Sequence, residues 1–283
     1  MIGAHGYQDW LGRREERMDT ITAAPLVRLA ALFDEPSWLE SAQQLPPLGH
    51  WLYHLPTSPQ SAIGVDGHAV RGGFLPPVAL PRRMWAGSRV RFHGDIPIGI
   101  QIVRRSTVVD VKVKGEKGDK VFVTVRHELI TGEGIAITED QDIAYLGAPQ
   151  ATKNPSTLIV MPPPTQVRCT VADSVALFRY SAITFNAHRI HYDRDYARSV
   201  EGYPGLVVHG PFLATMLMDH FLRNQPNARV RAFEFRARSP LFDGVPFELC
   251  LAERGGETDL WARSSENSPA MTATVVFDIA CAS

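Results

Sequence analysis

Gly205-Leu206-Val207-Val208-His209-Gly210-Pro211 runs directly into an apolar stretch, Phe212 to Leu222, and this junction decides the fold of the second half. Pro211 suits the first turn of a helix. Strand-like segments follow it at residues 230–237, 247–253, 258–264 and 271–279. A buried helix followed by a run of strands predicts an α+β unit, in which the helix packs on an antiparallel sheet.

The first half of the chain repeats this order of elements. Trp10 to Phe33 is predicted to be helical in two pieces, and Pro36 ends the helix. Ile98–Ile102, Thr107–Lys114 and the residues up to Tyr145 alternate or are rich in β-branched side chains, which is typical of strands. The sequence therefore predicts a second helix-and-sheet unit.

A weak internal echo links the two halves. Arg89–Ile98 resembles Phe235–Pro246 in character, because each has a basic strand and then a small turn that contains Asp and Pro. Residues 148–164 are rich in Pro and suit a linker. We therefore predict two domains, residues 1–150 and 151–283. Residues 44–82, rich in Pro and Gly, are expected to form a long functional loop or a wrap over a neighbouring surface.

The segment Phe185-Asn186-Ala187-His188-Arg189-Ile190-His191-Tyr192-Asp193 carries the polar groups. It lies shortly before the helix that is predicted to begin at Pro211. A proton-transfer cluster beside a helix N-terminus suits chemistry on a thioester, because the helix end holds the negative carbonyl oxygen that forms during reaction. His191 is the first candidate, since imidazole gives or takes a proton near neutrality. A lone histidine is more often structural, but the surrounding polar groups favour catalysis.

Composition excludes several classes of function. The net charge is −1 over 283 residues, so no basic excess indicates nucleic acid or a membrane surface. The longest apolar runs are too short for a membrane span, and the N-terminus lacks the apolar core of a signal peptide. The three cysteines have no metal-ligand or disulfide spacing. A cytoplasmic enzyme without a metal or a redox cofactor fits these observations best.

The two motif segments resemble those of the MaoC-like (R)-specific enoyl-CoA hydratases and type 2 hydroxyacyl-thioester dehydratases. The usual pattern of this family is Asp, any residue, Asn-Pro, any residue, His, with a His-Gly step about twenty residues later. Here the histidine falls on His191 and the step on His209-Gly210, but Asn186 stands where the family has its catalytic Asp. The resemblance implies a double hotdog, in which two helix-wrapped antiparallel sheets form one continuous sheet. It also implies a degenerate N-terminal half and a catalytic C-terminal half.

The resemblance further implies roles for single residues. His191 manages the proton of a water molecule, and the Gly210 N–H polarises the thioester carbonyl, while His209 shapes the turn or lines the substrate site. An amide cannot act as a base, so Asn186 either holds the water or merely caps a turn. The α-carbon would then be protonated by His191 itself or by another acid, for which His188 and Asp193 are the candidates.

The substrate is also indicated by resemblance. Asp66-Gly67-His68 and the run from Arg71 to Gly87 look like the corresponding part of hydratases that act on mesaconyl-C4-CoA and itaconyl-CoA. Arg189, in the place of the usual Pro, is then the best candidate for binding a substrate carboxylate, because guanidinium binds carboxylate in bidentate geometry. The side chains expected to line the CoA or acyl channel are Tyr53, His68, Arg82, Arg83 and Trp85.

The sequence thus predicts a hydro-lyase that reversibly hydrates an enoyl-CoA thioester, giving citramalyl-CoA from a C4 dicarboxylic substrate. The acyl-CoA substrate is its partner, and a homodimer is the assembly we consider. Three alternatives stay open. They are a general 3-hydroxyacyl-thioester dehydratase of fatty acid metabolism, a thioesterase on the same fold, and a non-catalytic acyl-CoA-binding protein.

Overall fold

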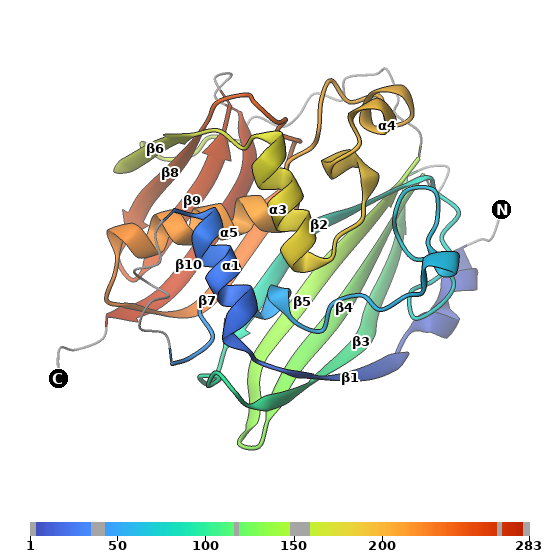
Figure 1. Ribbon diagram of the computed structural model, residues 1–283, viewed down its shortest axis with the longest axis horizontal. Helices are drawn as coiled ribbons and strands as arrows, with labels where there is room; N and C mark the ends of the chain where they lie inside the picture. The colour runs from blue at the N-terminus through green and yellow to red at the C-terminus, as the bar shows by residue number, and fades with distance from the viewer. Residues whose placement is uncertain (1–3, 35–42, 116–118, 148–158, 265–267, 280–283) are drawn as a thin grey trace.

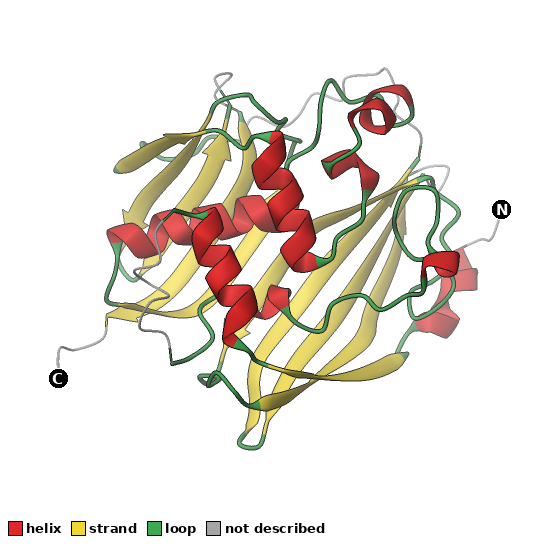
Figure 2. Ribbon diagram, in the orientation of Figure 1, coloured by secondary structure: helices red, strands yellow, loops and turns green. Residues whose placement is uncertain are grey.

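One sheet of ten strands forms the body of the protein, and its helices lie on one face of that sheet (Figures 1 and 2). The computed structural model describes residues 4–34, 43–115, 119–147, 159–264 and 268–279. Neighbouring strands are antiparallel in the order β1-β3-β4-β5-β2-β7-β10-β9-β8-β6. The strands are β1 (Arg14–Thr20), β2 (Arg82–Phe92), β3 (Gln101–Lys114), β4 (Lys120–Thr131), β5 (Gly134–Leu146), β6 (Gln166–Thr170), β7 (Ala228–Ala237), β8 (Phe247–Arg254), β9 (Glu257–Arg263) and β10 (Pro269–Ile279).

The two halves of the sheet mirror each other. The order β1-β3-β4-β5-β2 in the first half corresponds to β6-β8-β9-β10-β7 in the second, and β2 and β7 pair at the centre. The echoed segments lie at the ends of these two central strands, so the internal echo marks a real structural repeat. The α+β double hotdog is confirmed. The proposed domain boundary after residue 150 lies outside the described residues and stays a prediction.

The helices have different roles in the two halves. They are α1 (Ala23–Leu32), α3 (Ser174–Thr184), α4 (Arg194–Ser199) and α5 (Gly210–Asn224), with 3-10 turns η1 (Ala4–Trp10), η2 (Gly49–Leu52), η3 (Gln60–Ala62) and η4 (Arg189–His191). In α5, the residues Phe212–Phe221 are all buried, and the helix contacts β2, β7, β8, β9 and β10. Pro211 occupies the first turn of α5, as expected. The helix therefore begins at the centre of the sheet.

The predicted helix over Trp10–Phe33 is wrong in its first part. Arg14–Thr20 is the edge strand β1, which pairs with β3 and alternates between exposed and half-buried side chains. That period of two residues belongs to a strand, and the charged side chains conceal it because an edge strand tolerates them. Only Ala23–Leu32 is helical, and Pro36 lies outside the described residues. The strand expected over Thr107–Lys114 is part of β3, which begins at Gln101, so only the last two residues of the strand expected over Ile98–Ile102 belong to it.

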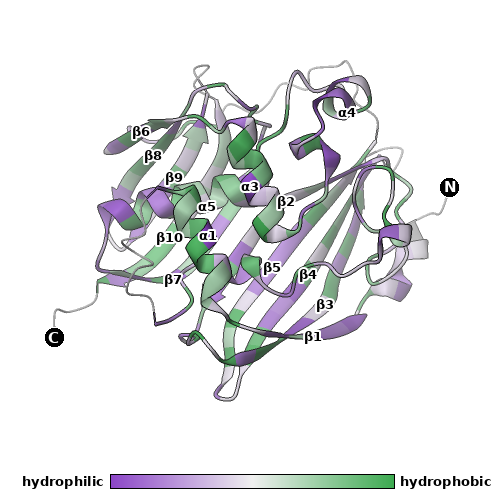
Figure 3. Ribbon diagram, viewed as in Figure 1, coloured by the Kyte–Doolittle hydropathy of each residue, from purple (hydrophilic) through white to green (hydrophobic). Residues whose placement is uncertain are grey.

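No described residue of the first half forms a long helix on the face of the N-terminal strands that corresponds to the one α5 covers in the second half. The helix α1 packs mainly on α3 and η2, which corrects the expectation of one helix lying in each sheet. Figure 3 shows hydrophilic stretches on β3, β4 and β5, whereas α1 and α3 are largely hydrophobic. The long loop of residues 44–82 covers part of this face instead, since Phe74, Leu75, Val78 and Leu80 join a core cluster with β3, β4 and β5. The remaining face is free to form a cavity.

Gly87 allows β2 and β7 to approach closely at the centre of the sheet, because it has no side chain. A Cβ at Gly87 would lie 2.4 Å from the carbonyl oxygen of Phe235 on β7. We expect Gly87→Ala to lower the free energy of unfolding by about 1–3 kcal/mol, because the backbone must shift to relieve the overlap. Urea unfolding followed by circular dichroism measures the change.

Gly94→Ala is the matched control for this variant. Nothing lies within 4 Å of a Cβ at Gly94, so its stability should stay close to that of the wild type. Equal stability of Gly87→Ala and the wild type would contradict the close approach of β2 and β7.

Candidate active site

The two motif segments are tied together through the backbone of Val207. The N–H of Val207 donates to the carbonyl of Ile190 at 2.9 Å, and its own carbonyl accepts from His191 Nδ1 at 2.7 Å. Before them, Phe185 ends α3 in the left-handed conformation, with φ of 49°. This residue turns the chain so that η4 and its histidines lie beside the start of α5.

His191 is held in one tautomer. Because its Nδ1 carries the hydrogen that is donated to Val207, Nε2 presents a lone pair, and no described residue hydrogen-bonds to that atom. Burial, and then the neighbouring ring of His188, lower the pKa of His191 to about 3. The side chain is therefore a neutral imidazole at physiological pH, with Nε2 able to accept a proton.

Four imidazole rings form a contiguous row in the site. The ring centroids of His191 and His209 are 3.7 Å apart, those of His191 and His188 are 5.3 Å apart, and those of His188 and His68 are 4.2 Å apart. Burial lowers the pKa of each of the four. His209 is fully buried, and its Nε2 lies 2.8 Å from Ser181 Oγ. It stacks on the ring of His191, and its expected place in the substrate site stays a prediction.

Gly210 is the first residue of α5, so its N–H belongs to the helix end that has no intrahelical acceptor. A Cβ at this position would meet only the carbonyl oxygen of Trp85 within 4 Å, at 3.6 Å, an ordinary contact. The protein itself therefore has room for a larger residue at position 210. A need for glycine here would come from a ligand that approaches the N–H.

The remaining motif residues are engaged within the protein. Asn186 Oδ1 accepts from the N–H of His188 at 3.0 Å, which is the turn-capping geometry, and its amide group also lines the cavity described below. Arg189 donates to Asp193 from Nη2 at 2.7 Å and lies over the ring of Tyr196. Asp193 also caps α4 by accepting from Tyr196 N at 3.0 Å. Arg189 and Asp193 thus hold each other and α4 in place. Arg189 also lines the cavity described below, so the roles of both toward a substrate stay predictions.

A cavity of 960 Å³ opens onto both motif segments. Asn186 and Pro211 line it from the second half, and side chains of β3, β4 and β5 line it from the first half. Its polar lining includes Arg104, His127, Glu139, Gln141 and His54. It occupies the face of the N-terminal strands on which the described residues place no long helix, so both halves of the chain contribute to its wall.

The channel residues expected from the sequence do not all face this cavity. Tyr53, Arg83 and Trp85 line it, and so does His68. Arg83 lies over the ring of Tyr145, with 6.0 Å to the ring centroid, and has no ion-pair partner among the described residues. Burial raises the pKa of Tyr53 to about 12, and its hydroxyl donates to the carbonyl of Thr22. Arg82 is not part of the lining, and its Nε donates to the carbonyl of Gly147 at 3.0 Å, which argues against a channel role.

Three polar features of the cavity were not foreseen as parts of the site. Glu139 is buried and accepts from Ser88 Oγ at 2.6 Å and from the ring nitrogens of His50 and Trp51 at 3.0 Å each. Burial raises the pKa of Glu139, but His50, His127 and Ser88 together lower it to about 2. Arg104 reaches the cavity without a described ion-pair partner, and Asp66 orients His68. Glu139 and Arg104 occupy strands that look ordinary in sequence, whereas Asp66-Gly67-His68 in a Gly-rich loop carried a signal.

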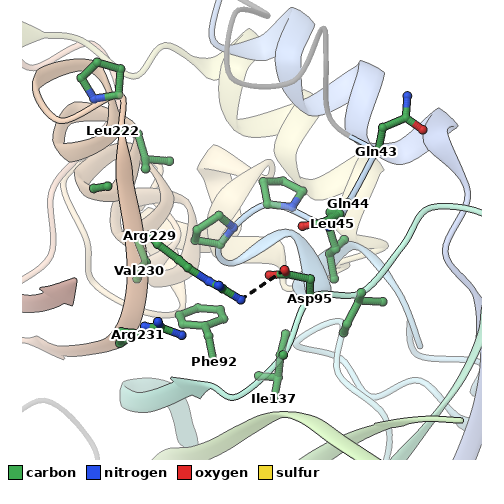
Figure 4. Close-up of a pocket in the computed structure, with 16 residues that line it drawn as sticks. Gln43, Gln44, Leu45, Phe92, Asp95, Ile137, Leu222, Arg229, Val230 and Arg231 are labelled. Atoms are coloured by element: carbon green, nitrogen blue, oxygen red, sulfur yellow. Dashed lines mark hydrogen bonds and ion pairs between the residues drawn. The ribbon is translucent and has the colours of Figure 1, made fainter. Parts of the chain in front are cut away.

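A second cavity of 540 Å³ lies beside the end of β2 and the start of β7 (Figure 4). Phe92, Ile137 and Leu222 contribute apolar side chains to it, and Arg229 pairs with Asp95 at 3.2 Å across its mouth. None of the site histidines lines it. The larger cavity is the candidate site because His68, Asn186 and Pro211 line it, whereas the rings of His188, His191 and His209 lie behind its lining.

No described helix is long and apolar enough to cross a membrane. No group of three or more His, Cys, Asp or Glu side chains in the described residues has the geometry to hold a metal ion.

Comparison of the sequence with known proteins shows its family. The family model of hydroxyacyl-thioester dehydratase type 2 matches residues 48–243. The chain is 44% identical over 273 residues to mesaconyl-C(4)-CoA hydratase of Chloroflexus aurantiacus, which covers 94% of this chain and 96% of that protein. It is 30% identical over 244 residues to the mitochondrial hydroxyacyl-thioester dehydratase type 2 of Schizosaccharomyces pombe, covering 77% and 80% of the two chains.

Solved structures show the same fold at low sequence identity. A MaoC-like dehydratase from Phytophthora capsici superposes with a TM-score of 0.73 at 14% identity, covering 95% of this chain and 96% of that one. A Mycobacterium tuberculosis protein with a double hotdog fold superposes with a TM-score of 0.56, also at 14% identity, over 95% and 96% of the two chains. The family model covers residues 48–243, and the relative at 44% identity covers nearly the whole chain. This protein therefore belongs to the hydroxyacyl-thioester dehydratase type 2 family.

Proposed function

We propose that this protein is a hydro-lyase that reversibly hydrates a C4 dicarboxylic enoyl-CoA, either mesaconyl-C4-CoA or itaconyl-CoA, to citramalyl-CoA. One observation carries the reaction class: a neutral His191, fixed through Nδ1, lies beside the free N–H groups at the start of α5. The identity of 44% to mesaconyl-C(4)-CoA hydratase supports the substrate. The homodimer and the cytoplasmic location stay predictions.

Each group of the site has a defined part in this reaction. The Gly210 N–H donates to the thioester oxygen, which makes the β-carbon electrophilic and stabilises the enolate. His191 Nε2 takes one proton from water as the oxygen bonds to the β-carbon. The same imidazolium then returns that proton to the α-carbon, and His191 is neutral again at the end of the cycle. Because Asn186 Oδ1 already accepts from His188, its amide N–H is the group left to donate to the water oxygen.

The cavity lining favours a dicarboxylic substrate over a fatty acyl chain. A general fatty acyl dehydratase needs a long apolar tunnel without a cation at the acyl end. The lining includes five arginines, and three of them, Arg71, Arg83 and Arg104, have no ion-pair partner among the described residues. Arg71 donates to the backbone carbonyls of Val78, Leu80 and Pro81, which leaves the guanidinium groups of Arg83 and Arg104 for a substrate carboxylate. Such a group is stabilised by a carboxylate in the substrate. The dehydratase relative at 30% identity supports the fatty acyl alternative only distantly.

The proposed reaction is tested with purified protein and three substrates. We expect water addition (+18 mass units) to mesaconyl-C4-CoA or itaconyl-CoA, measured by mass spectrometry, with crotonyl-CoA as the comparison. His191→Ala should lower kcat by about 10²–10⁴-fold, because it removes the proton-transfer group. Turnover of crotonyl-CoA alone would move the protein to the fatty acyl dehydratases. Hydrolysis of the thioester would indicate a thioesterase, and binding without turnover would indicate an acyl-CoA-binding protein.

The dependence on pH tests the neutral imidazole. A base works in its deprotonated form, and the lowered pKa of His191, about 3, keeps it deprotonated in moderately acidic solution. We therefore expect kcat/KM to show no loss centred near pH 6.5, the ordinary pKa of histidine. Folding is checked at each pH, because unfolded histidines take up protons below that pKa and stability then declines. A half-loss of activity near pH 6.5 in folded protein would show that an unperturbed histidine carries the reaction.

The cation at the acyl end is located by three variants. Arg83→Leu and Arg104→Leu each remove a cavity guanidinium, and we expect one of them to raise KM for the dicarboxylic substrate about tenfold or more while sparing crotonyl-CoA. Arg105→Leu is the matched control, because Arg105 neighbours Arg104 in β3 but pairs with Glu16 at 2.7 Å. Unchanged selectivity in both cavity variants would remove the electrostatic argument for a dicarboxylic acyl group.

A further inference from the structure

The loop of the first half is seated directly on the catalytic motif of the second. The N–H of Arg189 donates to the carbonyl of Asp66 at 3.0 Å, and Arg189 Nη1 donates to the carbonyl of Val65 at 3.1 Å. Gly67 has φ of +91°, and a Cβ on it would lie 1.7 Å from the carbonyl oxygen of Ala187. Only glycine fits this contact, so the position of the loop relative to the motif is tightly defined.

The contact of this loop with the motif brings a hydrogen-bonded pair, Asp66 and His68, to the candidate active site. His68 Nδ1 lies 3.2 Å from Asp66 Oδ2, and the N–H of His68 donates to Asp66 Oδ1 at 3.0 Å. Because a carboxylate only accepts, Nδ1 carries the hydrogen and His68 Nε2 presents its lone pair. The His68 ring lines the large cavity and lies 4.2 Å from the ring of His188. A histidine oriented by a carboxylate is the arrangement that enzymes use for a proton-accepting group.

The groups around His68 keep it neutral. Burial lowers the pKa of His68 first of all, the guanidinium groups of Arg83 and Arg71 lower it further, and Asp66 raises it. Asp66 keeps its charge, since hydrogen bonds from His68 lower the pKa of its carboxyl against the effect of burial. A lone pair on Nε2 is therefore present under the conditions in which the site works.

Asn186 leaves the motif of the second half without the carboxylate acceptor of the family pattern, and the ring of His188 contacts those of both His191 and His68. Water has two hydrogens, and His191 accepts only one of them. Asn186 stands where the family has a carboxylate, and its Oδ1 is taken up by the N–H of His188. Its remaining amide hydrogens donate and cannot orient the second hydrogen of the water.

We propose that His68, oriented by Asp66, supplies this second acceptor, so that the N-terminal half contributes a catalytic residue to the hydratase site. This inference rests on the proposed function. One water hydrogen passes to His191 Nε2 as the oxygen bonds to the β-carbon, and it is later returned to the α-carbon. The other hydrogen stays on the oxygen, becomes that of the product hydroxyl, and is accepted by His68 Nε2 as a hydrogen bond. His68 keeps its own protonation state throughout, and Asp66 acts as a positioning residue.

Three variants test the role of His68 through the split between kcat and KM. His68→Ala should lower kcat about 10–100-fold with little change in KM, because a hydrogen bond that orients the reacting water is lost. His68→Gln should recover part of this loss, because the amide oxygen can accept the same hydrogen bond. Asp66→Asn should resemble His68→Ala, because an amide cannot accept at both of the positions where Asp66 now accepts, and the tautomer of His68 is no longer fixed.

His93→Ala is the control, because this exposed histidine contacts Thr138 at 3.0 Å and lies outside both motif segments and the cavity lining. Its kcat should equal that of the wild type. Thermal unfolding of each variant shows whether the loop stays in place. If His68 had only a structural role, His68→Gln would not recover kcat.

The outcomes separate the two proposals. Absence of water addition by the wild type on all three thioesters would overturn the proposed function itself. Wild-type turnover that is lost in His191→Ala but kept in His68→Ala and Asp66→Asn would overturn only the role of the Asp66–His68 pair. Equal loss in the alanine and glutamine variants, together with a lowered melting temperature, would also overturn it and leave His68 as a packing residue.

Discussion

The antiparallel pairing of β2 with β7 is the constraint on which the rest of the structure depends. It joins two helix-and-sheet units into one ten-stranded sheet and brings Gly87 against the backbone of Phe235. Because α5 begins over this junction, the first residue of the helix lies next to Trp85 of the other half. The end of the helix dipole, which polarises the proposed substrate, is therefore positioned by strands from both halves. Neither unit alone would contain the complete site.

The two halves of the sheet differ in what covers the face that carries the helices. In the second half, α5 fills the face with Phe212–Phe221, all of them buried. In the described part of the first half no long helix lies there, and the space is a cavity of 960 Å³ with a polar lining. Burying charge is tolerated only where it is compensated, as the three donors around Glu139 show. We therefore propose that the first half forms the substrate side, where guanidinium groups in the cavity wall would bind an anionic acyl end.

Burial decides the chemistry of the histidine row. Four imidazoles in mutual contact would repel one another if they were charged, and desolvation removes the charge by lowering each pKa. A neutral ring still donates from one nitrogen and accepts at the other. Val207 and Asp66 each take the hydrogen of one Nδ1, which leaves the two Nε2 atoms as acceptors. In the role that we propose for it, His68 takes the place of the carboxylate that the family pattern has at Asn186.

The sequence by itself determined the elements and the two motif segments, because local propensity and spacing are encoded along the chain. Pro211 marked the start of α5, the strand pattern of the second half matches β7 to β10, and the ring of His191 stacks on that of His209, the residue just before α5. It misread Arg14–Thr20, whose pairing with β3 involves residues about ninety positions away. It also favoured Arg189, which pairs with Asp193, and it did not identify Arg104 or the contact between His68 and the motif residue His188, although it did place His68 in the channel. Only the tertiary structure decided these, because a cavity and a contact between halves are made by residues that are distant in sequence.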